Sequence, residues 1–495
     1  MNAYKQLKLI FSRIYHLQNI HYILLWDEAV MMPEYAGKTR AKVMGTLSRL
    51  TQKMLRRRKI QPLIDITKKE SLDLLDKVNL DWMEKKHRIA SSIPLKIVEK
   101  LTETSFLSEQ AWRILRPQNN WKDFLPFLEK TFYFVNEIAQ RKSQILGLHP
   151  YDALIDEYAP GFDQISIDSL FSELKDALPI LIKKITAKQR EEKMNLPLGP
   201  FSLEKQKQLS EMIAKSLGFK LARGRLDESH HPFSCGDRSD ARVTNRYDES
   251  NFLSGVFGIC HEVGHALYEQ GLPKKWQFQP VGHVNSMAMH ESQSLLIEME
   301  FCRSREFFDY LTPILQSELG KQEAMTVENL HKVVTRVTSS LIRVDADEVT
   351  YPLHVILRYE LEKELLNGEI QIKDLPARWN ELMTCYLGIS TKDNYTNGVM
   401  QDVHWPSGTF GYFPAYTIGR MIAAQFYSTF INVHPDFPSE VKKGQFQLLH
   451  GWLQKNVYNV ASSLPTKTII QNVTKEPLCA KYFIDRIEKR YLNFK

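Results

Sequence analysis

Apolar residues recur at three- and four-residue steps along most of the chain, in stretches rich in Leu, Lys, Glu and Gln. This spacing places apolar side chains on one face of a helix, so it predicts a mainly α-helical protein. The clearest predicted helices cover residues 4–25, 124–140 and 355–366. Alternation typical of strands is limited to residues 220–226 and 242–247, which predict a hairpin or a small three-stranded sheet.

The sequence carries few signs of division into domains. It has no repeat at a fixed period, no low-complexity tract and no long Gly/Ser linker. Its strongest interruption is Leu-Pro-Leu-Gly-Pro at residues 196–200, where a boundary between an N-terminal helical lobe and a C-terminal half could fall. One large domain over residues 1–495, with a cleft between two helical lobes, explains the missing linker equally well, and we predict this single domain.

Composition and charge say little about partners. The chain has 495 residues, 43% of them hydrophobic, and its 65 basic and 58 acidic residues leave a net charge of +7. The basic run at residues 56–59 has no aromatic residues interleaved with it. We therefore interpret it as the solvated end of a helix rather than a nucleic-acid site.

The cysteines and the apolar runs indicate the cellular setting. The five cysteines are widely spaced and form no CxxC pair, which argues against a disulfide framework or a thiolate zinc site and fits a reducing compartment. Charges interrupt the apolar positions near the N-terminus, unlike a signal peptide, and no run reaches the ~20 apolar residues of a membrane span. We predict a soluble cytoplasmic protein that binds neither nucleic acid nor membrane.

The segment His261-Glu-Val-Gly-His265 matches the pattern HExxH. On a helix, residues four apart lie on the same face, so both imidazoles can reach one metal ion. Glu262 lies one step round the helix and can hold a water molecule without being a ligand. This arrangement is typical of zinc peptidases, in which the glutamate is the general base. The alternative interpretation is a coincidental pair of helix histidines that bind no metal.

The residues around the pattern favour the helix that it needs. Apolar residues recur at helical spacing from Leu253 to Leu267. Asp248 or Ser250 can cap the beginning of this helix, and Gly271, with a proline two residues later, can end it.

A catalytic zinc ion needs a third protein ligand and keeps its fourth position for water or substrate. Metzincins carry a histidine six residues after the second one, and here that position is a glycine, which excludes that class. The next cluster, residues 290–294, opens a further predicted helix over residues 295–310 and offers Glu291. His290 and His283 are alternative ligands, and Glu291 could instead cap the first turn of its helix.

Longer motifs around these residues resemble a known family. HEVGHALYEQGL at residues 261–272 and HESQS at residues 290–294 are similar to the M32 family of metallocarboxypeptidases, the thermostable carboxypeptidase Taq type. Weaker likenesses begin at Leu-Trp-Asp at residues 25–27 with Met-Pro at 32–33, and continue at residues 151–161, so the resemblance covers essentially the whole chain. Further specific motifs are spread along the rest of the chain. They are His-Pro-Phe at 231–233, Asp-Ala-Arg-Val-Thr at 240–244, Ile-Arg-Val-Asp-Ala-Asp at 342–347, Gly-Val-Met-Gln-Asp-Val-His-Trp at 398–405 and Phe-Gly-Tyr-Phe-Pro-Ala-Tyr at 410–416.

The resemblance implies a function and a site. It implies a mainly α metallopeptidase domain with a deep groove between helical lobes, one Zn²⁺ per chain that Co²⁺ or Mn²⁺ can replace, and a homodimer. The implied reaction is hydrolysis of the C-terminal peptide bond of peptides, releasing single amino acids with broad specificity except proline. The implied metal ligands are His261, His265 and Glu291, and the implied catalytic base is Glu262.

Hydrolysis of an amide also needs donors for the oxyanion that forms at the attacked carbonyl. Tyr412 and His404 are the candidates, because the resemblance places their segments beside the site. Tyr412 could instead be a core aromatic residue, and Asp402 could simply satisfy the imidazole of His404. His231 precedes a proline, which favours an extended backbone that could direct this imidazole into the groove.

An exopeptidase must recognise a free carboxylate, and the planar guanidinium of arginine suits this task. Arg343 lies in an apolar-leaning stretch, and the family pattern favours it as the residue that binds the substrate carboxylate. An internal ion pair with Asp345 or Asp347 is the alternative. Arg242 and Asp240 would point to the same side of a strand, and we interpret them as part of the architecture of the cleft.

Two other functions fit the same residues. An endo-oligopeptidase or a dipeptidyl carboxypeptidase could be built on the same zinc helix and would differ only in where the peptide terminus is held. A helical scaffold with structural zinc belongs to a different class. A metal position that solvent can reach separates catalytic from structural zinc.

Overall fold

The computed structural model of the protein describes residues 2–492. Among these residues helices dominate and the strands form a single small sheet, so the predicted mainly α fold is confirmed. The predicted helices lie within α1 (Ala3–Val30), α6 (Trp121–Leu146) and, for residues 355–366, α14 (Tyr351–Leu366). In this part of the chain, no helix has both the length and the apolar content to cross a lipid bilayer.

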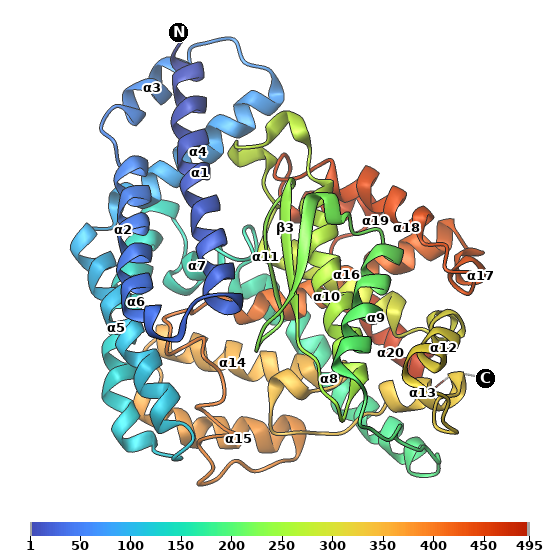
Figure 1. The fold of residues 1–495 in the computed structure, drawn as a ribbon. Helices are drawn as coiled ribbons and strands as arrows, with labels where there is room; N and C mark the ends of the chain where they lie inside the picture. Colours follow the sequence, from blue (N-terminus) through green and yellow to red (C-terminus); the bar gives the residue numbers. More distant parts are fainter. Residues whose placement is uncertain (1, 493–495) are drawn as a thin grey trace.

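Figure 1 shows α1 to α6, coloured blue to cyan, gathered on one side of the molecule and α17 to α19 on the other. The N-terminal helices also include α2 (Gly37–Leu55), α3 (Ile60–Thr67), α4 (Leu74–Ser92), α5 (Leu95–Leu115), α7 (Pro150–Ile155), α8 (Gln164–Arg190) and α9 (Leu203–Ser216). Besides α14, the C-terminal helices include α10 (Phe252–Gly271), α11 (Met287–Leu295), the π-helical segment η5 (Leu296–Cys302), α12 (Arg305–Leu319), α13 (Val327–Val334), α15 (Leu375–Leu387), α16 (Phe413–Val433), α17 (Phe437–Val441), α18 (Gln447–Leu453), α19 (Thr466–Thr474) and α20 (Lys481–Tyr491).

The sheet consists of β1 (Gly224–Glu228), β2 (Phe233–Asp237) and β3 (Asp240–Asn245), in the order β1-β3-β2. β1 runs parallel to the central β3, whereas β2 pairs with β3 in an antiparallel hairpin. The first predicted strand begins too early, because Leu221–Arg223 form a 3₁₀ turn. The sequence pattern does not predict β2, because its short run Phe-Ser-Cys-Gly-Asp lacks the β-branched residues that mark strands.

One large apolar core holds most of the chain together. It extends from Trp121 to Tyr491 and includes Ile185 and Phe201, which lie on either side of the interruption at residues 196–200. Apolar packing therefore continues across this interruption. A second, smaller core joins α1, α3 and α4 near the N-terminus.

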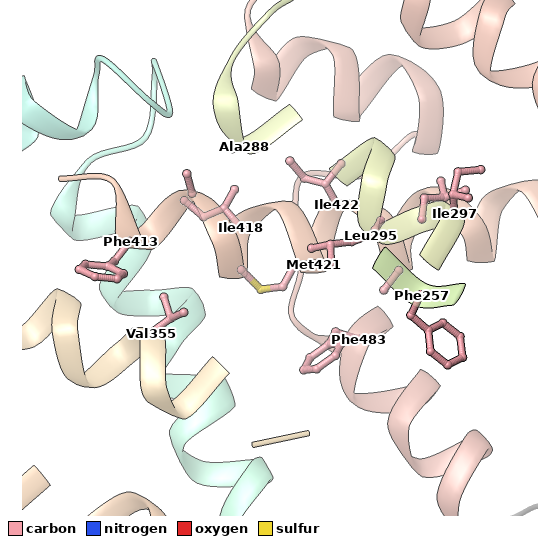
Figure 2. Packing of buried hydrophobic residues seen from close by; sticks show 14 of the residues in the cluster. Phe257, Ala288, Leu295, Ile297, Val355, Phe413, Ile418, Met421, Ile422 and Phe483 are labelled. Carbon is pink, nitrogen blue, oxygen red and sulfur yellow. The ribbon is translucent and has the colours of Figure 1, made fainter. Parts of the chain in front are cut away.

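Helix α16 lies at the centre of the main core (Figure 2). Ile418, Met421 and Ile422 of this helix are fully buried, and the helix packs against α11, α14 and α20. Burial of one such side chain contributes about 1.5–3 kcal/mol of transfer free energy. α16 is thus the element against which the helices around it are fixed.

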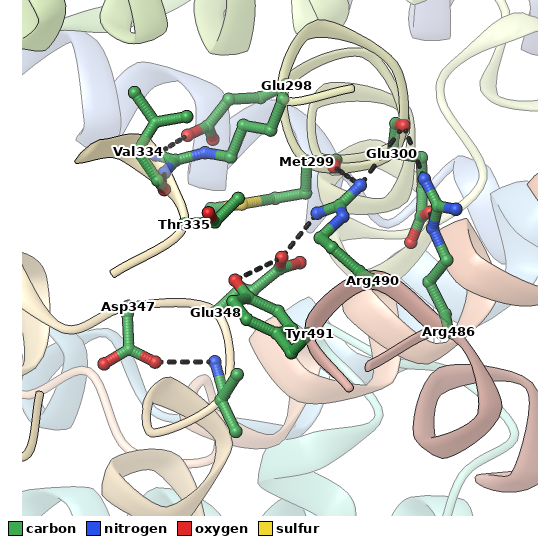
Figure 3. Close-up of polar contacts among 12 residues, drawn as sticks. Glu298, Met299, Glu300, Val334, Thr335, Asp347, Glu348, Arg486, Arg490 and Tyr491 are labelled. Carbon is green, nitrogen blue, oxygen red and sulfur yellow. Dashed lines mark hydrogen bonds and ion pairs between the residues drawn. The ribbon is translucent and has the colours of Figure 1, made fainter. Parts of the chain in front are cut away.

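A buried network of charges fastens the C-terminal helix α20 to this core (Figure 3). Glu300 and Glu348 are buried, and arginines from α16 and α20 pair with both. Arg420 Nη2 lies 2.8 Å from a Glu348 oxygen, and Arg486 Nε lies 2.7 Å from a Glu300 oxygen. Arg490 also pairs with Glu348. Because removing one partner of a buried ion pair costs about 3–5 kcal/mol, this network holds α20 firmly in place.

Two glycines allow three helices to approach closely. A Cβ atom on Gly264 of α10 would lie 2.6 Å from Cα of Ser294 on α11, closer than the contact distance of packed carbon atoms. A Cβ atom on Gly419 of α16 would lie 2.9 Å from Cβ of Glu291, also on α11. Helix α11 is therefore held between α10 and α16 at distances that require glycine.

We predict that Gly264→Ala destabilises the protein by about 1–3 kcal/mol, because the new methyl group overpacks a contact with backbone atoms. The matched control is Gly45→Ala in α2, where a Cβ atom would meet nothing within 4 Å. The control should be neutral or should raise stability by up to about 1 kcal/mol, the difference in helix propensity. Urea unfolding followed by circular dichroism measures both, and equal midpoints for the two variants would contradict the close α10–α11 contact.

Candidate active site

The HExxH residues lie on α10, which ends at Gly271 as predicted. The predicted N-caps, Asp248 and Ser250, are wrong, because Asn251 is the N-cap residue. Asp248 instead accepts hydrogen bonds from the backbone N–H and the hydroxyl of Ser250, both at 2.7 Å, in the preceding turn.

Glu291 lies on α11, and it does not cap that helix. Ser286 is the N-cap, and its Oγ accepts the backbone N–H of Met289 at 3.0 Å. The predicted helix over residues 295–310 is wrong as a single element. The π-helical segment η5 forms its first part and ends at Cys302, and α12 begins anew at Arg305, with Ser304 as its N-cap. Figure 3 shows Glu298 and Glu300 of η5 making separate sets of polar contacts.

His261, His265 and Glu291 come together where α10 meets α11. One ligand atom from each residue lies within 4.8 Å of the other two. Nε2 of His265 is 3.4 Å, and Nε2 of His261 is 3.9 Å, from the same oxygen of Glu291. Ligand atoms about 2.1 Å from a tetrahedral zinc ion lie about 3.4 Å apart, so this donor set and spacing fit one Zn²⁺.

The two alternative ligands lie elsewhere. Nδ1 of His290 faces Nδ1 of His265 at 2.5 Å, whereas the Nε2 edge of the His265 ring faces Glu291. His283 packs edge-on against Tyr15, with ring centroids 4.6 Å apart. Neither histidine belongs to the metal-binding group that the described residues form.

Three carboxylates, those of Glu262, Glu291 and Glu298, make this site strongly negative. Burial disfavours the charged form of His261, but the three carboxylates outweigh this effect and raise the pKa of its imidazole to about 10. Glu298 makes the closest contact, with one oxygen 3.0 Å from Nδ1 of His261. Such a concentration of negative charge attracts a cation.

Glu262 has the properties of a general base. It is buried, and within residues 2–492 its Oε2 atom has no hydrogen-bond partner. Burial raises the pKa of its carboxyl group to about 7, against the opposing effect of His261. A group with a pKa near neutral is suited to accept a proton and return it.

A second buried group of charges surrounds Asp402. Nε and Nη2 of Arg343 donate to one oxygen of Asp402, at 3.0 and 2.8 Å, and Nε of Arg358 donates to the other at 2.6 Å. The alternative interpretation of Arg343 is an internal ion pair with Asp345 or Asp347. Arg343 does form an internal ion pair, but its partner is Asp402. Asp347 instead accepts backbone N–H groups just before α14.

This group carries an unbalanced positive charge, because two guanidinium groups share one carboxylate. Burial and the neighbouring Arg343 lower the pKa of Arg358 to about 10. Nη1 of Arg343 donates to the hydroxyl of Tyr351 at 2.7 Å, a neutral partner. One further carboxylate beside Arg343 would balance the charge.

Tyr412 and His404 lie together with Tyr416 at the beginning of α16. The ring of Tyr412 is 5.7 Å from that of His404 and 5.0 Å from that of Tyr416. Nε2 of His404 is 3.1 Å from the Tyr416 hydroxyl, and the predicted contact with Asp402 is wrong, because two arginines occupy both oxygens of that carboxylate. Burial, followed by the negative charge of Glu291, raises the pKa of Tyr412, so its phenol stays a proton donor near the metal-binding group.

Glu362 is a residue of this region that the sequence patterns do not identify. Its buried carboxylate accepts the indole N–H of Trp405 and the backbone N–H of Gly411, both at 2.8 Å. It thereby joins the segment that carries His404 to the segment that carries Tyr412. A signal existed, because Glu362 lies on the apolar face of the helix predicted over residues 355–366, where an acidic residue requires partners.

His231 and Arg242 lie near the sheet. His231 is exposed and packs edge-on against His230, with ring centroids 4.6 Å apart. Arg242 on β3 pairs with Asp240 on the same strand at 2.8 Å, as the strand pattern predicts, and its guanidinium covers the ring of Trp26 at 4.5 Å. Arg242 thus joins the sheet to α1.

Known proteins resemble this chain along its whole length. Thermostable carboxypeptidase 1 of Thermus thermophilus is 34% identical over 508 residues, which cover 99% of this chain and 98% of the relative. Carboxypeptidase 1 of Bacillus subtilis is 33% identical over 490 residues, which cover 98% and 97%.

Solved structures show the same agreement in three dimensions. Metallocarboxypeptidase 1 of Trypanosoma cruzi superposes with a TM-score of 0.97 at 35% identity, and 99% of each chain is covered. The M32 carboxypeptidase of Deinococcus radiodurans gives 0.94 at 31% identity, with 99% of this chain and 98% of the other covered. The model of the family described as carboxypeptidase Taq (M32) metallopeptidase matches residues 6–491. With these likenesses and the metal-binding group on α10 and α11, the chain belongs to the carboxypeptidase Taq (M32) family of metallopeptidases.

Proposed function

We propose that this metallocarboxypeptidase uses Zn²⁺ and releases single amino acids from the C-terminal ends of peptides, with broad specificity except for proline. The observation that carries the proposal is the group of His261, His265 and Glu291, which stands beside a buried carboxylate with an unpaired oxygen. Two nitrogen ligands and one oxygen ligand form the donor set of catalytic zinc sites that keep a fourth position for water or substrate.

Zn²⁺ held by these three residues would act as a Lewis acid toward the scissile carbonyl. Glu262 takes a proton from the attacking water and passes it to the leaving amine. Tyr412 or His404 donates a hydrogen bond to the oxyanion, a role for which the protonated phenol of Tyr412 is suited. A proline after the scissile bond offers no N–H for binding, which gives a physical reason for its poor release.

Recognition of the peptide terminus rests on the charges around Arg343. Among residues 2–492, Asp402 is the charged partner that Arg343 and Arg358 share, so the group retains about one positive charge. A terminal carboxylate supplies the missing negative charge. An oligopeptidase substrate, which presents a neutral peptide bond at this place, would leave the buried charge uncompensated.

The setting and the assembly extend the proposal. All five cysteines are free, which fits the reducing cytoplasm. The family resemblance favours a homodimer. The cytoplasmic location, the homodimer and the use of Zn²⁺ rather than Co²⁺ or Mn²⁺ stay predictions.

The base and the ligands should respond differently to substitution. Glu262→Gln should abolish turnover and leave zinc bound, because Glu262 is not a ligand. Glu291→Ala and His265→Ala should lose zinc as well as activity. Zinc content after dialysis, measured by atomic emission, separates the two outcomes, and full zinc content in Glu291→Ala would remove Glu291 from the site.

A short unstructured peptide should lose single residues one after another from its C-terminus, and a chelator should stop the reaction. Mass spectrometry of the digest at successive times follows the products. Release of dipeptides would favour a dipeptidyl carboxypeptidase, and cleavage at internal bonds would favour an oligopeptidase. Loss of zinc together with unfolding, and no hydrolysis by the zinc-loaded protein, would favour the scaffold with structural zinc.

Amidation of the peptide terminus should lower kcat/KM by roughly 30- to 1,000-fold, which corresponds to the ~2–4 kcal/mol of a broken buried charge pair. Arg343→Met should cause a similar loss on the free acid and little further loss on the amide, because both changes delete the same interaction. This variant leaves Arg358 and Asp402 as a balanced pair.

The control for this experiment is Arg378→Met, which removes a guanidinium paired with Glu364 on α14 and should affect neither substrate. Equal rates on acid and amide, or equal impairment of both by Arg343→Met, would show that Arg343 is structural. The carboxypeptidase mechanism would then need another anchor.

A further inference from the structure

We propose that His290 is a positioning residue that orients the ligand His265 and strengthens metal binding, an inference that rests on the zinc site proposed above. The two histidines come from different helices, His265 from α10 and His290 from α11. Both rings are largely buried, and their Nδ1 atoms lie 2.5 Å apart. The contact is therefore a direct hydrogen bond between imidazoles with little competition from water.

The contacts determine where the protons lie. Nε2 of His265 faces Glu291, so a metal there would take this nitrogen and leave the ring proton on Nδ1. That N–H can donate only to an unprotonated Nδ1 of His290. His290 must then carry its own proton on Nε2, which lies 3.1 Å from a carboxylate oxygen of Glu269. Two hydrogen bonds in series, from His265 through His290 to Glu269, fix both rings.

The other histidine ligand has a different support. Nδ1 of His261 lies 3.0 Å from Glu298, whose second oxygen accepts from Nη2 of Arg303 at 2.9 Å. Arg303 is held in turn by the carbonyl of Val334 at 3.1 Å. Each ligand on α10 thus has its own partner at Nδ1, a carboxylate for His261 and an imidazole for His265.

Helix α11 therefore contributes to the metal site in two ways. Neighbouring side chains on a helix point about 100° apart, so when Glu291 faces the metal, His290 points to a different side of the site. In HESQS, Glu291 is the proposed ligand, and His290 supports the other ligand, His265, on α10. Loss of such a support lowers metal affinity by about 10- to 100-fold in metalloproteins.

The test measures the zinc affinity of apoprotein by competition with a chromogenic chelator, and it needs no activity. His290→Leu removes the acceptor for His265 and should weaken zinc binding by about 10- to 100-fold. His290→Asn places a carbonyl oxygen near the position of Nδ1 and should recover most of the affinity. The control is His450→Leu, which removes an imidazole of α18 packed against Gly218 and should leave the affinity unchanged.

Thermal unfolding of the apoproteins checks that each variant is folded. If His290→Leu does not fold, the zinc affinity of His290→Asn still tests the proposal. Equal affinity of wild type and His290→Leu would overturn the positioning role and leave the zinc site intact. Equal losses in the leucine and asparagine variants would also overturn it, because an acceptor at this place would then have no effect. If wild type bound zinc no better than His265→Ala, the proposed zinc site itself would fail.

Discussion

The site depends on how closely α10 approaches α11. His261 and His265 come from one helix and Glu291 from the other, so the spacing of the three donor atoms is set by the spacing of two backbones. Gly264 lies between the two histidines, and a Cβ atom there would come within 2.6 Å of Cα of Ser294. Metal–ligand distances tolerate deviations of about 0.2 Å, and a methyl group would separate the helices by more than this. The glycine inside the HExxH pattern thus determines the geometry of the site.

Two buried groups of opposite charge favour one orientation of a peptide bound in the site. Carboxylates from α10, α11 and η5 surround His261 of the candidate metal-binding group, whereas Arg343 and Arg358 share a single aspartate beside the tyrosines of α14 and α16. Under the proposed function, the scissile carbonyl belongs at the first group and the terminal carboxylate at the second. A peptide in the reverse direction would place its ammonium group beside the guanidinium groups, which like-charge repulsion disfavours.

Local patterns in the sequence predict local features well. The spacing of His261 and His265 sets their common face on a helix, and the apolar periodicity predicts that helix. The pair of Arg343 and Asp402 could not be predicted in this way, because its members are 59 residues apart, on the segments that precede α14 and α16, and only the tertiary fold brings them together. Sequence spacing pointed to aspartates two and four residues from Arg343 instead. Glu362 carried a signal, an acidic residue on an apolar face, but its partners lie 43, 49 and 211 residues away.

Under the proposed function, catalysis and recognition share one packed element, helix α16. An oligopeptidase and a carboxypeptidase can have the same zinc helix, so the difference must come from residues outside α10. Here those residues lie on or just before α14 and α16, with Glu362 joining the segments that precede α16. The same α16 holds α11 at Gly419, against the side chain of Glu291. A shift of α16 would therefore displace Glu291, the proposed third ligand, together with Arg343, the proposed anchor for the terminus, whose guanidinium lies over the ring of Tyr416 on α16. This coupling ties the distance between the candidate metal-binding group and Arg343 to the core rather than to a loop.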